Sequence, residues 1–262
     1  MNTTNQILTV SIIGSGNVAT ALGEVISSNG IRVLEVFSPN IDNSKLLAEK
    51  VGCNYVENLE KLNTISDLYI IAIPDNEISN VITKLKSKEG IMVHTSGSQP
   101  SDVFEGKFHH YGVFYPLQTF TKGKQVDFQE VPICIEGSND ITSELLVQLA
   151  KKISNNVVLL NSEKRQYLHL TAVTVNNFSN LLYNLAHDVL NEKDIDFSLL
   201  HPLIKETAVK IRDVNPYQAQ TGPALRKEIS TINKHLELLD KYSEYKEIYN
   251  LLTRQIINKH HG

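Results

Sequence analysis

Short apolar runs alternate with helical patterns over about the first 160 residues, and this alternation limits the fold more than anything else in the 262-residue chain. The first four runs are rich in Ile and Val, as expected of strands buried on both faces of a parallel sheet. Alternating β and α segments favour a doubly wound parallel sheet with helices on both faces. The predicted strands cover residues 8–13, 32–37, 68–73, 91–94, 112–115, 132–135 and 157–160, and the predicted helices cover 17–28, 43–51, 76–87 and 141–153.

The pattern changes after residue 161, and no later run predicts a strand. Ser162 and Glu163 are suited to cap a helix that runs to about residue 191. Pro223 is suited to be the first residue of a later helix, because proline is common in the first turn. Asp75, at the end of a predicted strand, is suited to cap the helix that follows. We predict two domains, an α/β domain over residues 1–160 and an all-α domain over residues 161–262.

Composition and charge argue against several classes of function. The net charge of −4 implies no basic surface for nucleic acid, and no apolar run reaches the roughly 18 residues that a membrane helix needs. The first residues lack the basic flank of a signal peptide, and the two cysteines form no CxxC pair, so we expect a cytoplasmic protein. The adjacent pair His109-His110 has no acidic partner nearby, and no metal site is predicted.

A glycine loop lies where the first predicted strand gives way to the first predicted helix. Gly14 allows a tight turn, Gly16 lets backbone N–H groups approach phosphate oxygens, and Ala19 allows the helix to pack closely on the strand. The N-terminus of the helix favours negative charge. The loop is therefore interpreted either as a binding site for a dinucleotide pyrophosphate in a Rossmann-like domain or as a plain structural turn. The predicted cofactor-binding residues of this loop are Gly14, Ser15, Gly16, Asn17, Val18 and Ala19.

The end of the second predicted strand indicates which dinucleotide the loop would hold. An NAD site usually has an acidic residue there, but Glu35 lies two residues too early. Ser38 and Asn40 could donate hydrogen bonds to a 2′-phosphate, and Lys45 could add positive charge, so NADP is favoured over NAD. Later strand ends are expected to flank the adenosine and nicotinamide sides of the cofactor, through Ile73, Pro74, Thr95, Ser96 and Gly97.

The segment RQYLHLTAVTVNNFSNLLYNLAHDVL is typical of one long amphipathic helix. Its apolar stripe, predicted to be core or subunit interface, consists of Leu168, Ala172, Val175, Leu182, Leu185 and Val189. A second line holds His169, Asn177, Asn180, Asn184 and His187, although Asn is a poor helix former. This line is either a solvated face or the wall of a cleft. In the second case His169 is the candidate proton donor, since imidazole titrates near pH 6.5, and Asn177 would orient the substrate.

A polar loop in the helical half is a candidate anion site. Thr221 precedes Gly222 and Pro223, whose position predicts a helix N-terminus with free N–H groups, and Arg226 lies one turn further on. A simple helix cap explains the same residues equally well. If the site is functional, Gln118, Thr221 and Arg226 are expected to hold the polar end of a substrate, most simply a carboxylate.

These motifs together resemble a bacterial family of NADP oxidoreductases that joins a Rossmann-like domain to a helical C-terminal domain. The matching blocks are GSGNVATALG, ISDLYIIAIPD, HTSGS, GVFYPLQTF, LHLTAVTVNNFSNLLYNLA, HPLIKET and AQTGPALR. The family looks related to pyrroline-5-carboxylate reductases and β-hydroxyacid dehydrogenases, including the C-terminal domain of 6-phosphogluconate dehydrogenases. The resemblance implies that the C-terminal helices form a homodimer and close the active site against the nicotinamide.

Two departures from those relatives concern the chemistry. β-Hydroxyacid dehydrogenases have a catalytic lysine on the first long helix, where this chain has His169. Their Gly-rich substrate loop is replaced by residues 115–119. The leading hypothesis is an NADPH-dependent reductase of a small carbonyl or imine that bears a carboxylate. The alternative is an NADP-binding sensor without turnover, which the missing lysine favours.

Overall fold

The structure is a computed structural model, and it describes residues 6–86 and 88–262. The chain divides into two compact units, Met1–Asn177 and Phe178–Gly262. The predicted domain boundary at residue 160 precedes Asn161, the N-cap of the first long helix, whereas the division by contacts places the first part of that helix, as far as Asn177, in the first unit.

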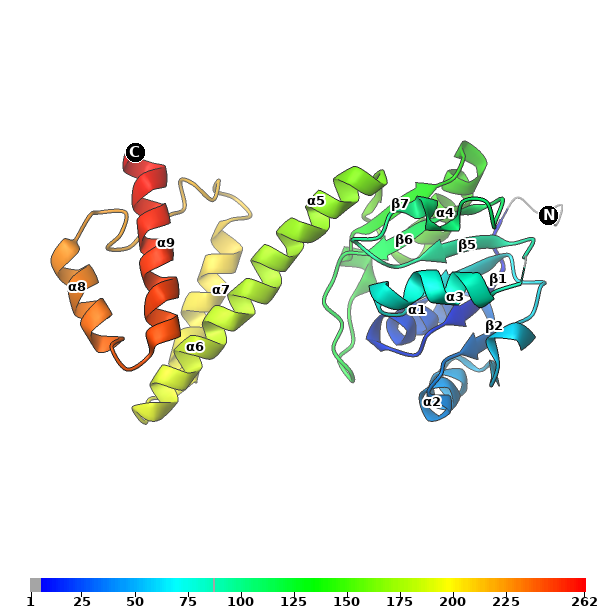
Figure 1. The fold of residues 1–262 in the computed structure, drawn as a ribbon, viewed down its shortest axis with the longest axis horizontal. Coiled ribbons are helices and arrows are strands. Elements are labelled where there is room, and N and C mark those ends of the chain that lie inside the picture. The colour runs from blue at the N-terminus through cyan, green and yellow to red at the C-terminus, as the bar shows by residue number, and fades with distance from the viewer. Residues whose placement is uncertain (1–5, 87) are drawn as a thin grey trace. The chain divides into compact units, whose positions relative to one another are not determined.

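A mixed sheet forms the centre of the first unit (Figure 1). Among the described residues it has eight strands in the order β3-β2-β1-β4-β5-β6-β7-β8. All neighbours are parallel except β6 and β7. The strands are β1 (Thr9–Ile13), β2 (Arg32–Phe37), β3 (Asn54–Val56), β4 (Leu68–Ile71), β5 (Ile91–His94), β6 (Tyr111–Pro116), β7 (Ile133–Gly137) and β8 (Val157–Leu159).

The two faces of the sheet bury different sets of side chains, because successive residues of a strand point to opposite sides. Ile12 faces the core that the sheet shares with α1 (Asn17–Ser28), α2 (Ile41–Val51) and α4 (Asp140–Ile153). Ile13 faces the other core, which includes residues of α3 (Ile78–Lys84). The doubly wound α/β fold is thus confirmed, and the loops at the carboxyl ends of the parallel strands are free to form a site.

The strands differ from the prediction in two respects. The edge strand β3 was not predicted, because it has three residues and its first two, Asn54 and Tyr55, are exposed. The junction of β6 with β7 is antiparallel, since the segment between them contains only a short 3₁₀ turn, Phe128–Glu130. A parallel pair would need a longer crossover, usually a helix.

The helix predicted over residues 76–87 begins as a 3₁₀ turn, Asp75–Glu77, and continues as α3 to Lys84. Its last predicted residue, 87, lies outside the described residues. The long helix predicted from Ser162 is confirmed as three consecutive pieces, α5 (Ser162–Val173), a π turn (Thr174–Phe178) and α6 (Ser179–Glu192). The π turn contains the boundary between the two units.

The described part of the second unit contains helices joined by turns and no strand, as predicted. It consists of α6, α7 (His201–Lys210), α8 (Ile229–Leu238) and α9 (Ser243–His261). The prediction that a helix begins at Pro223 is wrong. The chain makes one turn there and then Lys227 takes a φ of 54°, which breaks the helical path, so that α8 begins at Ile229.

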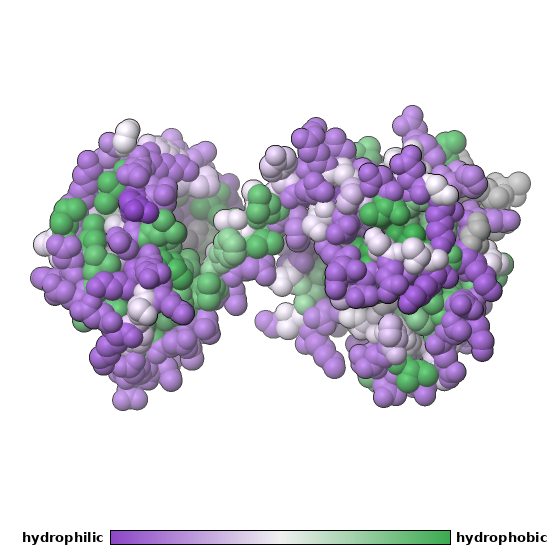
Figure 2. Space-filling model, in the orientation of Figure 1, coloured by the Kyte–Doolittle hydropathy of each residue, from purple (hydrophilic) through white to green (hydrophobic). Residues whose placement is uncertain are grey.

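Large apolar side chains stay exposed along α6 and α7, and neither helix buries a residue within the chain. Leu181 on α6 is 47% exposed and Leu203 on α7 is 63% exposed. Figure 2 shows hydrophobic side chains at the surface of this unit. The predicted stripe residues Leu182, Leu185 and Val189 are half-buried. No described helix is long and apolar enough to cross a membrane.

Candidate functional site

Gly14 closes the turn after β1 in a way that only glycine allows. Its φ is 124°, and its N–H donates to the carbonyl of Phe37 at 2.7 Å. A Cβ at this position would lie 2.1 Å from the carbonyl oxygen of Ala72, at the end of β4. The turn therefore packs against the ends of both neighbouring strands, and its shape is fixed by backbone contacts.

Gly16 has the opposite surroundings. It is the N-cap residue of α1 with an ordinary φ of −74°, and no described heavy atom lies within 4 Å of the place where a Cβ would be. No side chain of the described residues caps this helix end. The first N–H groups of a helix have no partner within the helix, so they and the open space at Gly16 suit a phosphate group.

The glycine loop opens into a cavity of about 1020 Å³, near the upper end of the range for small-molecule sites. The cavity lies at the carboxyl ends of the parallel strands, as in other open α/β sheets. It brings together most of the predicted site residues. Those that line it are Gly14, Ser15, Gly16, Asn17, Val18, Ser38, Ile73, Pro74, Thr95, Ser96, Gly97, Gln118, His169 and Asn177.

Four predicted site residues lie elsewhere. Ala19 is fully buried against the sheet, as its packing role requires. Asn40 caps α2, where its side-chain oxygen accepts from the N–H of Asn43 at 3.0 Å, and it is not among the lining residues. Thr221 and Arg226 belong to the second unit, where Arg226 pairs with Glu228 at 2.6 Å. Their proposed contact with a substrate stays a prediction.

The tip of β2 presents hydroxyl groups to the cavity. Ser15 Oγ donates to Ser38 Oγ at 2.7 Å, which joins the glycine loop to this tip. Glu35 points elsewhere, because its carboxylate accepts from the N–H of Asn63 at 2.5 Å. Lys45 lies over the ring of Tyr55 and is not a lining residue. The charged residues of the lining are acidic, and it contains no Lys or Arg among the described residues.

Asp75, one of those acids, does not cap a helix as predicted. Pro74 takes the N-cap position of the 3₁₀ turn, and no described side chain caps it. The Asp75 carboxylate instead accepts from Ser98 Oγ at 2.5 Å. This hydrogen bond connects the loop after β4, which contains Asp75, to the loop after β5, which contains Ser98.

The histidine at the end of β5 shapes that second loop and does not take part in the cavity. His94 is fully buried; Ser96 N–H donates to its Nδ1 at 3.2 Å, and its Nε2 donates to the carbonyl of Pro100 at 3.2 Å. Burial lowers the pKa of His94 to about 4. A neutral imidazole therefore holds the backbone that presents Thr95, Ser96 and Gly97 to the cavity.

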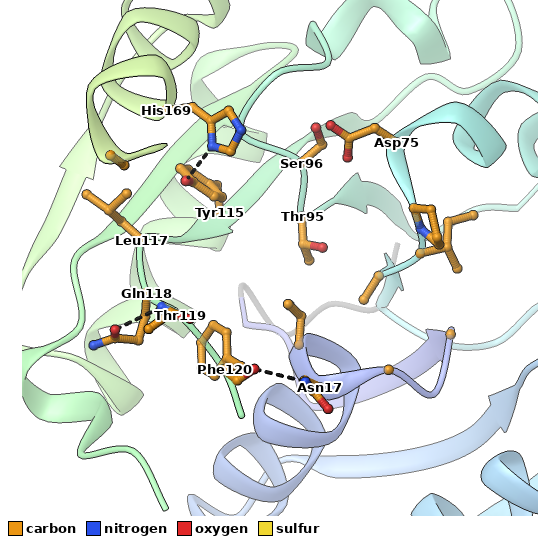
Figure 3. A pocket seen from close by; sticks show the side chains of 18 of the residues that line it. Asn17, Asp75, Thr95, Ser96, Tyr115, Leu117, Gln118, Thr119, Phe120 and His169 are labelled. Carbon is orange, nitrogen blue, oxygen red and sulfur yellow. Dashed lines mark hydrogen bonds between the residues drawn. The ribbon is translucent and has the colours of Figure 1, made fainter. Parts of the chain in front are cut away.

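Tyr115 and His169 form a pair on the cavity wall that the sequence did not predict. Tyr115 Oη lies 3.0 Å from His169 Nδ1, and the two rings meet edge to face with centroids 5.9 Å apart (Figure 3). Tyr115 stands on β6 and His169 on α5, 54 residues apart. In the sequence, the pair is indicated only by Tyr115, whose hydroxyl lies near the end of a mainly apolar strand.

A buried ion pair fixes α5, and with it His169, against the sheet. The Arg165 side chain is fully buried and pairs through Nη1 with the Glu136 carboxylate on β7. Its Nη2 donates to the carbonyl of Gln99 at 2.5 Å. Ser162 Oγ donates to the same carboxylate at 2.8 Å. His169 lies one turn after Arg165, so its position on the cavity wall follows from this anchor.

The loop between β6 and β7 forms the other side of the cavity. Asn17 Nδ2 donates to the carbonyl of Phe120 at 2.9 Å, which ties this loop to the start of α1 (Figure 3). Gln118 lines the cavity from the same loop. The π turn contributes Asn176 and Asn177 to the lining, and such turns are frequent at functional sites.

Two family profiles match separate parts of the chain. Residues 9–96 match the family described as NADP oxidoreductase coenzyme F420-dependent. Residues 131–256 match a domain of unknown function, DUF2520. No protein with a curated description gives a significant match.

Solved structures extend the similarity over the whole chain. A crystal structure of a putative NADP oxidoreductase from Bacteroides fragilis is 38% identical, with a TM-score of 0.89, and the match covers 97% of this chain and 99% of that one. An imine reductase from Myxococcus stipitatus in complex with NADP⁺ is 13% identical, with a TM-score of 0.67, and covers 97% and 96%. A 1-pyrroline-5-carboxylate reductase from Streptococcus pyogenes is 11% identical, with a TM-score of 0.64, and covers 97% and 100%.

The last two likenesses show a shared fold. The first, at 38% identity over almost the full length of both chains, shows the family. The predicted resemblance is thereby confirmed. The chain belongs to the oxidoreductase family of that Bacteroides protein, in which an N-terminal NADP oxidoreductase domain is joined to a C-terminal DUF2520 domain.

Proposed function

We propose that this protein reduces a C=O or C=N bond of a small substrate with NADPH. The observation that carries the proposal is the open space at Gly16, at an uncapped helix N-terminus, in the same cavity as His169. A nucleotide-binding site by itself does not distinguish an enzyme from a sensor. The His169 imidazole in the same cavity gives the site a group that can exchange a proton with a substrate.

The residues around the glycine loop fit a dinucleotide. The pyrophosphate would lie on the N–H groups that follow Gly16, and the adenosine ribose beside Ser15 and Ser38. A 2′-phosphate would meet hydroxyl groups there and no β2 carboxylate, which supports NADP rather than NAD. Thr95, Ser96 and Gly97 would lie on the nicotinamide side, following the strand order of the sheet.

The bound dihydronicotinamide would supply a hydride to the substrate carbon. The residues of the protein would donate the proton and orient the substrate. His169 is the proposed proton source, and Asn177 and Gln118 are the proposed orienting groups, since all three line the cavity. Thr221 and Arg226, which belong to the second unit, are the proposed binding residues for a substrate carboxylate.

We further infer that two chains associate through the helices of the C-terminal half. A single chain leaves large apolar side chains exposed along α6 and α7, and such patches usually mark an interface. A cytoplasmic location is also inferred, because Cys53 and Cys134 are both free thiols.

The experiment is isothermal calorimetry with NADPH and NADH, followed by NADPH oxidation at 340 nm with a panel of keto acids and cyclic imines. Wild type should bind NADPH more tightly than NADH and oxidise it with at least one member of the panel. Gly16→Val fills the open space without straining the backbone, and it should abolish binding while the protein stays folded, with a thermal unfolding midpoint lowered only slightly because valine is a poorer N-cap residue than glycine.

Two other outcomes would overturn the proposal. Binding of NADPH without oxidation by any member of a broad panel would favour a sensor. No heat with either coenzyme would remove the nucleotide site altogether.

A further inference from the structure

Tyr115 and His169 differ in how they face the cavity. Tyr115 is 9% exposed and packs with Val113 and Cys134 behind the wall, whereas His169 is half-buried. Both line the cavity. The Tyr115 ring is therefore surrounded by apolar side chains, and its hydroxyl reaches the cavity. The hydroxyl is hydrogen-bonded to the His169 imidazole, which is partly accessible to solvent.

The hydrogen bond between the two has two forms. Among the described residues His169 Nδ1 is the one partner of Tyr115 Oη. When the imidazole is neutral, the phenol donates to Nδ1 and the ring carries its proton on Nε2. When the imidazole is protonated, Nδ1–H must donate to the phenol oxygen. The phenol O–H is then released, and the cavity is the open space it can turn toward.

The phenol stays protonated through the working pH range. Burial, with smaller contributions from Cys134 and Asp75 and against the opposing effect of Arg165, raises the pKa of Tyr115 to about 12. These three groups act on the phenol from β7, from the loop after β4 and from α5. Cys134 is itself a neutral thiol, because burial raises its pKa.

The loop after β5 is built around both rings. A Cβ on Gly97 would lie 2.6 Å from His169 Nδ1 and 2.8 Å from Tyr115 Cζ. Any side chain there would push the rings apart. The geometry thus depends on contacts from β5, β6 and α5 together, and it places the pair beside the proposed nicotinamide side of the cavity.

We propose that Tyr115 delivers the proton to the substrate and that His169 reloads it. As hydride from the dihydronicotinamide adds to carbon, the π electrons of the C=O or C=N bond move to the heteroatom. That atom takes the phenol proton, the Tyr115 oxygen takes the proton from Nδ1 of the imidazolium, and neutral His169 remains. The proposal rests on the proposed reductase function and assigns its last proton step.

The test compares wild type with Tyr115→Phe and with Tyr111→Phe, which removes a hydroxyl from the same strand outside the cavity lining. In ¹⁵N-histidine NMR the His169 signals are assigned by their loss in His169→Gln. Over a pH series, the imidazolium form of wild type and Tyr111→Phe should show a slowly exchanging Nδ1 proton, and Tyr115→Phe should lose it. The neutral imidazole of wild type should be the Nε2–H tautomer.

The second readout is NADPH oxidation with pyruvate and with 2-methyl-1-pyrroline. Tyr115→Phe should lower kcat about 100-fold or more and remove the fall of kcat at high pH, with the NADPH Kd within twofold of wild type. A Tyr115→Phe enzyme with the wild-type rate and pH profile overturns the proton step. If wild type reduces neither probe, NMR decides alone, and an Nδ1 proton that exchanges equally fast with and without the phenol overturns the proposal. Absence of NADPH binding in wild type would instead refute the reductase function itself.

Discussion

Arg165 on α5 and Glu136 on β7 form an ion pair whose guanidinium is wholly enclosed by protein. The pair joins the first long helix to the sheet, and Ser101 and Ser162 also donate to the same carboxylate. Because removal of one partner leaves the other charge buried and unpaired, we expect Glu136→Gln to lower the free energy of unfolding by about 3–5 kcal/mol. Urea unfolding measures this change.

The matched control for the buried pair is Lys50→Ala. Lys50 pairs with Glu24 at the surface, with both side chains about half exposed. Such pairs contribute about 0–1 kcal/mol. Equal effects of the two substitutions would show that the Arg165–Glu136 pair does not anchor α5.

Ser38→Asp should reverse the cofactor preference. A carboxylate at the tip of β2 repels a 2′-phosphate and can accept from the ribose hydroxyls of NAD. We expect the Kd for NADPH to rise about tenfold or more, on the order of 1.4 kcal/mol, while the Kd for NADH stays the same or falls. Fluorescence titration of the two coenzymes checks this.

Asn40→Asp serves as the control, two residues further along the chain. Aspartate caps helices as well as asparagine does, so α2 should keep its cap, and Asn40 does not line the cavity. If Asn40→Asp weakened NADPH binding as much as Ser38→Asp, the 2′-phosphate would have to lie within reach of both residues, as predicted from the sequence.

His94 should make the protein less stable in mild acid. The pKa of His94 is about 4 in the folded protein and 6.5 in the unfolded chain. Between these pH values the unfolded chain binds a proton at His94 and the folded protein does not. The loss of stability therefore begins as the pH falls through 6.5 and is complete near pH 4. At pH 5 it amounts to about 2 kcal/mol.

Comparison of urea unfolding at pH 7.5 and pH 5 measures that loss. His94→Asn has no titrating ring and should lose about 2 kcal/mol less than wild type between the two pH values. His109→Asn removes an exposed histidine and should behave as wild type. An unchanged pH dependence in His94→Asn would mean that folding does not lower the pKa of His94.

Leu203→Glu should weaken the proposed dimer. Leu203 on α7 is 63% exposed in the single chain, and burying a carboxylate in an apolar interface is costly. Sedimentation at micromolar concentration should show a dimer for wild type and a larger monomer fraction for the variant. Ile65→Glu, at a residue of the first unit that is 75% exposed, should leave the dimer intact.

The fold was predictable because its signals are local. Buried parallel strands consist of short runs of Ile and Val, and the glycine loop marks the junction of β1 and α1. The start of α8 shows the limit of such signals. Gly222 and Pro223 are typical of a helix N-terminus, but the positive φ of Lys227 ends the turn, and a single sequence does not reveal it.

The site was only partly predictable. The glycine loop, His169 and Asn177 were recognised from their neighbours in sequence, and they line one cavity. Tyr115 and Arg165 were missed, because each acts through a residue far away in the chain. A tyrosine in an apolar strand and an arginine in a helix look ordinary until the fold brings His169 and Glu136 to them.

The absence of Lys and Arg from the described cavity lining has a consequence for ionic strength. Fixed N–H dipoles, not mobile ammonium or guanidinium groups, would hold the pyrophosphate. Added salt weakens the attraction between a helix N-terminus and an anion, but less where the N–H groups contact the phosphate directly than between solvent-exposed charges. Coenzyme affinity should therefore fall less between dilute buffer and half-molar sodium chloride than that of a site built on basic side chains.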